Sequence, residues 1–112
     1  MGLHHPATEE IELAAVLHAL SDPQRLRIVR RLADTDGPMR CGSFDLDLAK
    51  STLTHHFRVL REAGVIEQRE EGTAKLNRLR REDLDRRFPG LIDAVLESPP
   101  TAAPARRAVA AR

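Results

Sequence analysis

The segment KSTLTHHFRVLREAGVI, residues 50–66, concentrates the side chains of this chain whose chemistry is most distinctive. Its Lys, Ser, Thr, His and Arg side chains are hydrogen-bond donors of the kind that bind phosphate oxygens and acceptor atoms on base edges. A solvated helix surface would more typically carry Glu–Lys pairs. The candidate binding residues of this segment are Lys50, Ser51, Thr52, Thr54, His55 and Arg58.

Helical periodicity places these donors on one face and apolar residues on the other. Leu53, Phe57 and Leu60 repeat at helical spacing, and His56 falls in the same stripe, so we expect it to pack at the core edge. His55 and Arg58 lie on the opposite face. Gly64 supplies the left-handed residue that ends such a helix.

Three helices are expected before this segment. The first is predicted over residues 8–20, with Thr8 as its N-cap. The second is predicted over residues 23–33, because Ser21 or Asp22 can cap a helix that begins at Pro23. We interpret the arginines of this second helix as a solvated face; they are Arg25, Arg27, Arg30 and Arg31. Residues 39–46 are predicted to form a short third helix, weakened by a glycine.

A β-hairpin is predicted directly after the donor-rich helix. Residues 65–70 and 74–79 read as two strands, and Gly72 lies at the tip. This order of helices followed by a hairpin predicts a mainly α protein with a small β-hairpin, a winged helix-turn-helix. Such a fold places a helix in the DNA major groove and a wing on the flanking phosphates. The predicted wing contacts are Arg69, Thr73 and Lys75.

The charge distribution favours the same interpretation. Residues 1–49 carry a net charge of −3, residues 50–81 carry +4 and residues 82–112 are neutral, within a total of +1. The basic excess therefore coincides with the predicted recognition helix and wing, as expected if this region meets a polyanion.

The remaining chain predicts a last helix and a dimer. A break is expected near Phe88, with a helix from there to Glu97. In a short chain with few large aromatic residues, the terminal helices offer more apolar surface than one domain hides, so we expect a homodimer. The predicted interface residues are Leu13, Leu17, Leu20, Leu91, Val95 and Leu96. The predicted organisation is a flexible N-terminus (1–7), one domain (8–97) and a disordered tail (98–112).

Three motifs together resemble the ArsR family of small bacterial winged-helix repressors: LSDPQRLRIVRRL, KSTLTHHFRVLREAG and GTAKLNRL. The resemblance implies a homodimer that binds an inverted-repeat operator and represses transcription until an effector releases it. The chain departs from the family pattern at Asp47, where the family often has Gly, and at Ala49, where it often has a Ser cap. We therefore expect Ser51 or Asp47 to satisfy the first free N–H groups of the helix.

Metal and redox chemistry have incomplete residue sets. Metal-sensing members of the resembled family use paired cysteines or a His–carboxylate site, and this chain has the single Cys41 and no histidine in its last helix. His4 and His5 lie in the terminus expected to be mobile. We expect no complete metal site and no cofactor, and we interpret Cys41 as a small buried residue. The alternative is a metal- or redox-responsive repressor that uses Cys41.

Other function classes are less well supported by the sequence. A hydrolytic enzyme needs a nucleophile–base pair, and none is recognisable, so an enzyme is not expected. A winged-helix module that binds only protein is the other alternative, and it would not need the basic excess. No secretory signal or membrane span is evident, and a single cysteine fits a reducing compartment, so a bacterial cytoplasmic protein, nucleoid-associated when bound to DNA, is expected. The operator, the regulated genes and the effector are not determined by these residues.

Overall fold

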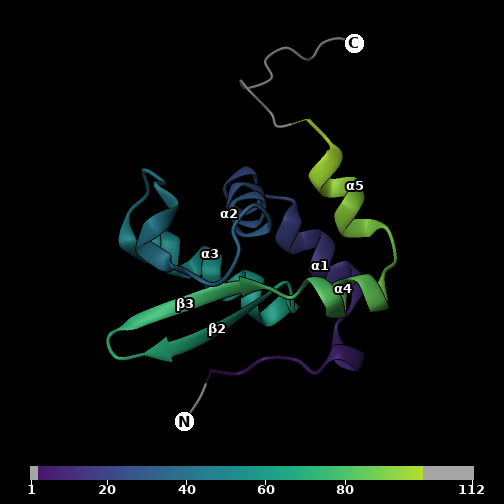
Figure 1. The fold of residues 1–112 in the computed structure, drawn as a ribbon, viewed down its shortest axis with the longest axis horizontal. Coiled ribbons are helices and arrows are strands. Elements are labelled where there is room, and N and C mark those ends of the chain that lie inside the picture. The colour runs from purple at the N-terminus through teal and green to yellow at the C-terminus, as the bar shows by residue number, and fades with distance from the viewer. Residues whose placement is uncertain (1–2, 100–112) are drawn as a thin grey trace.

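A computed structural model describes residues 3–99 of the chain (Figure 1). The helices pack on one side of a small antiparallel sheet whose hairpin projects from the body as a wing. The elements in chain order are η1 (Thr8–Glu10), α1 (Leu13–Leu20), α2 (Pro23–Ala33), β1 (Met39–Arg40), η2 (Cys41–Phe44), α3 (Lys50–Ala63), β2 (Ile66–Glu71), β3 (Ala74–Leu79), α4 (Arg81–Arg87) and α5 (Leu91–Glu97).

The first two helices agree with the sequence prediction to different degrees. Helix α2 has the predicted bounds, and Asp22 caps it by accepting from the backbone N–H groups of Gln24 and Arg25. The helix predicted over residues 8–20 is instead a short 3₁₀ turn followed by α1, with extended backbone at Ile11 and Glu12 between them. The prediction of Thr8 as N-cap was wrong, since its hydroxyl donates to Asp83.

The sheet contains a strand that the sequence did not predict. Residues 39–46 were expected to be helical, but Met39 and Arg40 form β1, which pairs antiparallel with β3, and a 3₁₀ turn follows. The strand order is β1-β3-β2, so β3 is central. Asn77 opposite Met39 explains the pairing locally, because its side-chain amide donates to the Met39 carbonyl.

The predicted hairpin is confirmed. Strands β2 and β3 pair from Ile66↔Leu79 at the body to Glu71↔Ala74 at the tip. Gly72 has a φ of +64° in the connecting turn, a conformation that favours glycine.

The C-terminal region breaks at Phe88 as predicted, but α5 begins later than expected. Helix α4 ends at Arg87, and Gly90 adopts a left-handed φ of +87° immediately before α5. The left-handed residue interrupts the helical path, so the predicted helix from Phe88 is shortened to Leu91–Glu97. Beyond Pro99 the predicted tail lies outside the described residues.

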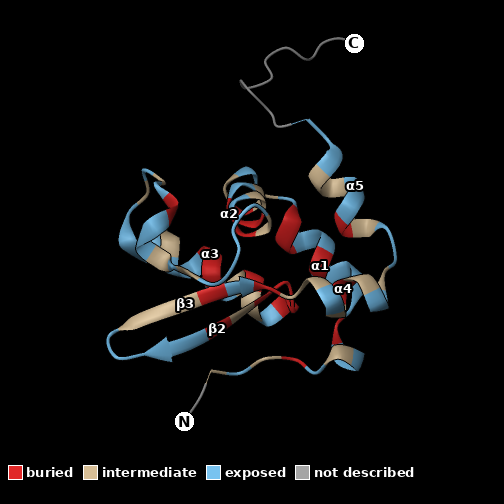
Figure 2. Ribbon diagram, viewed as in Figure 1, coloured by how far each residue is buried: buried red, intermediate tan, exposed pale blue. Residues whose placement is uncertain are grey.

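The core lies between the helices and the inner face of the sheet (Figure 2). Residues from every long helix contribute to it, including Val16, Val29, Phe57 and Leu84. Gly64 ends α3 with a φ of +89°, and a Cβ there would lie 2.7 Å from a side-chain carbon of Ile11. Glycine is therefore required at this position both for backbone conformation and for the close approach of the N-terminal segment.

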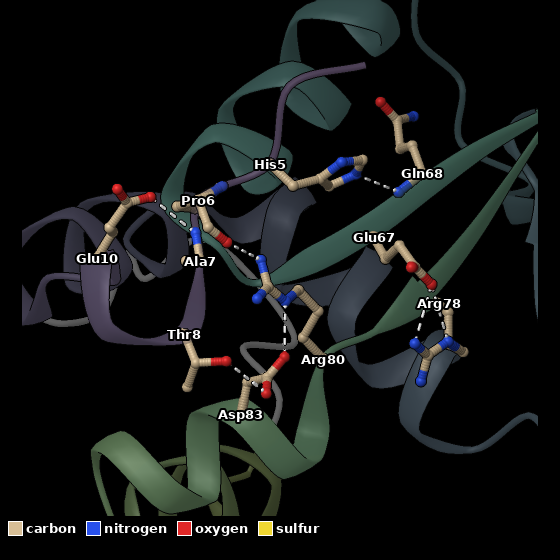
Figure 3. A network of polar contacts seen from close by, with 10 residues as sticks. All are labelled: His5, Pro6, Ala7, Thr8, Glu10, Glu67, Gln68, Arg78, Arg80 and Asp83. Carbon is tan, nitrogen blue, oxygen red and sulfur yellow. Dashed lines mark hydrogen bonds and ion pairs between the residues drawn. The ribbon is translucent and has the colours of Figure 1, made fainter. Parts of the chain in front are cut away.

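The N-terminal segment Leu3–Ile11 runs beside β2 and is held by polar contacts (Figure 3). The Nε2 atom of His5 accepts from the backbone N–H of Gln68 at 3.0 Å, and Arg80 donates to the Pro6 carbonyl at 2.8 Å. Thr8 donates to Asp83, which also pairs with Arg80. The contacts involve residues 5–8, and the flexible N-terminus expected for residues 1–7 stays a prediction.

Within residues 3–99, none of the helices combines the length and apolarity needed to cross a bilayer.

Candidate nucleic-acid interface

Helix α3 divides into a buried face and an open polar face, as its sequence pattern predicts. The buried face contains His56, Phe57 and Leu60, and the Leu60 side chain is fully buried. Six donor residues on the rest of the helix are all exposed: Lys50, Ser51, Thr52, Thr54, His55 and Arg58. The donors are available to a partner because the other face holds the helix on the domain.

Phe57 is the principal anchor of this helix. Its side chain is 2% exposed, and its ring meets the buried ring of Phe44 edge-on at a centroid distance of 5.3 Å. Phe44 belongs to η2, so the contact fixes the turn before α3 against the helix itself.

His56 is buried at the core edge, as predicted. Its Nδ1 lies 3.0 Å from Nη1 of Arg25, which can donate to it only while the imidazole is neutral. Burial lowers the pKa of His56; the Asp22 carboxylate opposes that effect, and the charge of Arg25 adds to it. The histidine therefore serves the packing of α3 on α2.

The prediction that the α2 arginines form a solvated face was wrong for two of the four. Arg25 is buried, and its guanidinium donates to the carbonyls of Ala19 and His18 at the end of α1. Arg30 donates to the carbonyls of Leu96 and Ser98 at the end of α5. Both arginines satisfy terminal helix carbonyls, which attract cations.

The wing presents further cations beside α3. Arg69 and Thr73 are exposed, and Lys75 is half-buried on β3, the central strand. Arg78, on the same hairpin, is instead paired with Glu67 at 2.9 Å.

Four cations of this face make no ion pair within residues 3–99: Lys50, Arg58, Arg69 and Lys75. Cations that keep their hydration and counterions can exchange them for phosphates. Lys50, Arg58 and Lys75 line one cavity, whereas Arg69 lies on the opposite face of the hairpin from Lys75. The open face of α3 and the wing therefore both present cations suited to a polyanion.

The N-terminus of α3 lacks a side-chain cap. Ala49 is the N-cap residue, and among residues 3–99 no side-chain cap bonds the first backbone N–H groups, so the expectation that Ser51 or Asp47 would do so was wrong. Free N–H groups at a helix N-terminus are well placed for a phosphate oxygen.

The predicted dimer residues fall into three groups. Leu13 and Leu17 are 45% and 48% exposed, a large fraction for leucine. Leu91, Val95 and Leu96 are half-buried against the core. Leu20 is buried within the single chain, so it belongs to the core and not to the surface of α1.

Cys41 is half-buried and not the fully buried residue that the sequence suggested. Its Sγ lies 3.2 Å from Nδ2 of Asn77 and 3.7 Å from Nε2 of Gln68. Among residues 3–99, no three His, Cys, Asp or Glu side chains gather closely enough to hold a metal ion. The predicted absence of a metal site stays a prediction.

The sequence did not reveal a buried polar network that links α3 to the sheet. Arg61 donates to Oε1 of Gln68 at 2.7 Å, and Nε2 of Gln68 donates to Oδ1 of Asn77 at 2.8 Å. Both amides are buried. In the sequence, the network is visible only as one amide residue on each of the two predicted strands. The register of the hairpin pairs Gln68 with Asn77, and the sequence pattern did not specify that register.

Known proteins match this chain over the same elements. A family model described as "Helix-turn-helix domain" matches residues 20–69, from the end of α1 into β2. The chain is 32% identical over 84 residues to the uncharacterized HTH-type transcriptional regulator YceK of Bacillus subtilis, covering 73% of this chain and 84% of that protein. It is 37% identical over 67 residues to the uncharacterized HTH-type transcriptional regulator MJ1325 of Methanocaldococcus jannaschii, covering 58% and 75%.

Solved structures share the fold. An ArsR family transcriptional regulator, RHA00566, superimposes with a TM-score of 0.62 at 23% identity over 73% of this chain and 90% of that one. HlyU from Vibrio cholerae gives 0.54 at 26% identity, covering 67% and 89%. The transcriptional repressor BigR from Xylella fastidiosa gives 0.54 at 28% identity, covering 68% and 85%.

These relatives agree with the exposed donor face of α3 and with the prediction that the chain is not an enzyme. The chain belongs to the HTH-type transcriptional regulators and has an ArsR-type winged helix-turn-helix fold, which makes it a DNA-binding transcriptional regulator.

Proposed function

We propose that this regulator is a homodimeric repressor that binds an inverted-repeat operator through α3 and the wing of each subunit. The observation that carries the proposal is the set of exposed donors on α3, together with cations of α3 and the hairpin that make no ion pair within residues 3–99. We also propose residues 8–97 as the folded unit that binds DNA and dimerises, with the N-terminal segment packed onto it.

In this arrangement α3 enters the major groove. Residues near the N-terminal end of a recognition helix reach base edges, and this end carries Lys50, Ser51, Thr52 and Thr54. His55 and Arg58, one turn further along, are long enough to reach base acceptors or phosphates. The uncapped N–H groups of the first turn would meet a phosphate oxygen.

The wing would contact phosphates beside the groove. Arg69, Thr73 and Lys75 lie near the hairpin tip, which projects from the body on the side of α3 (Figure 1). Contacts of this type position a protein on DNA without reading its sequence.

Dimerisation would bury the exposed leucines of α1. Leu13 and Leu17 are one helical turn apart, so they form one apolar strip on α1. Together with the half-buried Leu91, Val95 and Leu96 of α5, this strip supports an isologous interface. A two-fold dimer would hold two recognition helices about 34 Å apart, matching half-sites one helical turn apart.

The proposed DNA contacts of α3 are tested by alanine substitution with a matched control. The operator is first selected from random duplex DNA, and affinities are then measured by fluorescence anisotropy. Arg58→Ala and His55→Ala should each weaken operator binding by about 1–3 kcal/mol. Arg86→Ala removes an exposed arginine from α4, distant from the wing, and should leave affinity unchanged. Equal losses for Arg58→Ala and Arg86→Ala would contradict the assigned face.

The dimer half is tested by charge insertion. Leu13→Asp and Leu17→Asp place carboxylates in the proposed interface, and sedimentation should convert a wild-type dimer to monomer at micromolar concentration. Neither change touches the core, so the melting of the monomer should stay cooperative. A reporter gene under the operator should lose repression in the same variants. A wild-type protein that sediments as a monomer while binding the operator tightly would overturn the dimer.

A further inference from the structure

A partly open cavity of about 510 Å³ lies between the recognition helix, the wing, η2 and the N-terminal segment. This volume falls in the range of small-molecule sites. It overlaps the exposed face of α3, since Lys50, Thr54 and Arg58 line it as well.

The inner wall of the cavity is apolar with a polar floor. Leu3, Leu53 and Phe57 line it, together with the half-buried Cys41. The side chain of Gln68 lines it too and is held by Arg61 and Asn77. The floor is therefore fixed, because its amide groups are already hydrogen-bonded.

Leu3 is positioned over this wall by His5. The Nδ1 of His5 lies 3.0 Å from the Leu3 carbonyl. Figure 3 shows its other contact, in which Nε2 accepts from the backbone N–H of Gln68. A neutral imidazole makes both bonds at once, donating from Nδ1 and accepting at Nε2. The histidine thus joins the N-terminal segment to β2 at the edge of the cavity.

The charge of the cavity is entirely of one sign. Among the described residues that line it, four are cationic and none is acidic; the cations are Lys50, Arg58, Arg61 and Lys75. Lys50 and Arg58 are exposed and Lys75 is half-buried, so these three stand at the outer edge. A wall of apolar carbon with cations at the edge is complementary to a molecule that has an apolar body and an anionic head.

We propose that this cavity binds a small organic anion, such as a medium-chain carboxylate, with its apolar part against Leu3, Leu53 and Phe57 and its anionic head at the cationic edge. A further consequence rests on the proposed DNA contacts: a bound anion neutralises Lys50, Arg58 or Lys75, which would otherwise meet phosphates. Ligand and DNA then compete for the same charges, so each weakens the binding of the other by the same factor.

The first experiment tests the site without DNA. The full chain is titrated with the fluorescent probe 1-anilinonaphthalene-8-sulfonate, whose aromatic body and sulfonate match the proposed chemistry. Octanoate should displace the probe, whereas octanol and octylammonium, which share its chain but lack the negative charge, should displace it far less. Equal displacement by all three would overturn the assignment of an anion site.

Two matched variants locate the probe. Leu3→Asp places a carboxylate in the cavity wall and should weaken probe binding on the order of tenfold, since the new charge repels the sulfonate. Ala15→Asp places the same charge at an exposed residue of α1, outside the proposed dimer interface and away from the cavity, and should leave probe binding intact. The reverse pattern would place the probe on α1 and overturn the proposal.

The second experiment adds the operator. Saturating octanoate should weaken operator binding by the wild-type protein. It should also reduce the slope of log Kobs against log salt concentration by about one for each cation that octanoate neutralises. The Leu3→Asp protein should need on the order of tenfold more octanoate than wild type for the same loss of operator binding. If octanoate binds the cavity but the protein's affinity for the operator and the salt slope do not change, the proposed competition is wrong. Failure of the chain to bind any DNA, with the probe titration intact, would overturn the proposed function and not the ligand site.

Discussion

The wing side and the C-terminal side of this molecule use the same kind of residue in opposite ways. On the wing side Lys50, Arg58, Arg69 and Lys75 have no ion-pair partner within the described residues. On the C-terminal side Arg80 pairs with Asp83, Arg81 pairs with Asp85 and Asp93, and Arg87 donates to the Ile11 carbonyl.

This difference shows that a cation's partner, more than its presence, indicates its role. A paired arginine has already exchanged water for protein acceptors, and moving it to a phosphate would leave those acceptors unsatisfied. An unpaired one gives up only water and counterions when it meets DNA. The net basic charge of residues 50–81 includes cations of both kinds, so charge counting alone could not separate them.

The largest effect is expected from the core that supports the wing side. Phe57→Ala should destabilise the domain by about 3–5 kcal/mol, because the side chain is buried and packs on Phe44. Arg58→Ala, one residue further, should change stability by no more than about 0.5 kcal/mol. Urea unfolding of the two variants measures both. If Arg58→Ala unfolds at a lower urea concentration than Phe57→Ala, the assignment of the buried and open faces of α3 is wrong.

A smaller loss of stability is expected when a buried, hydrogen-bonded arginine is removed. Arg25→Ala should cost about 2–3 kcal/mol, since it leaves the Ala19 carbonyl and Nδ1 of His56 without their donor. Arg27→Ala, on the same helix but exposed, is the matched control and should stay within about 0.5 kcal/mol of wild type. Thermal melts of both variants measure these losses of stability. Equal losses would contradict the structural role of Arg25.

The wing cations should affect DNA binding and not stability. Lys75→Ala and Arg69→Ala should each weaken binding to all sequences alike and reduce the salt slope by about one. Arg81→Ala, which removes a paired arginine from the C-terminal side, should leave the slope unchanged. Titrations at several salt concentrations give the slopes. A shifted sequence preference with an unchanged slope would mean that the wing reads bases.

The smallest effect concerns acidification. Burial is the main cause that lowers the pKa of His56 from its ordinary 6.5; Asp22 opposes it, while Arg25 and His55 add to it. Burial also lowers the pKa of His5. As the pH falls, the histidines of the unfolded chain therefore take up protons before those of the folded chain. Their contribution to stability is fully present above about pH 6.5 and is lost as the pH falls through the lower pKa values of the folded state.

Unfolding midpoints at pH 7.5 and pH 5.5 measure this dependence. His56→Gln and His5→Gln should each flatten it, with His18→Gln as the exposed control. A wild-type protein that becomes more stable on acidification would reverse the assigned direction of both shifts.

Local patterns predicted much of the fold and of the candidate face. The bounds of α2 followed from Asp22 and Pro23, the end of α3 from Gly64, and the hairpin from its alternation around Gly72. Each of these signals acts within a few residues, so a sequence pattern can carry it. Strand β1 could not be predicted in this way, because a two-residue strand exists only through its pairing with β3.

The amino-acid sequence by itself determined which residues of α3 face outward, since the 3.6-residue period fixes the direction of each side chain once its apolar stripe is buried. Only the tertiary structure decided that Arg25 and Arg30 are bonded while Arg58 and Arg69 are free, and that Leu3, Leu53 and Lys75 share one cavity. Those outcomes depend on which helix ends and strands meet across long stretches of chain. No period or composition in the sequence encodes such contacts, because they arise from the packing of whole elements.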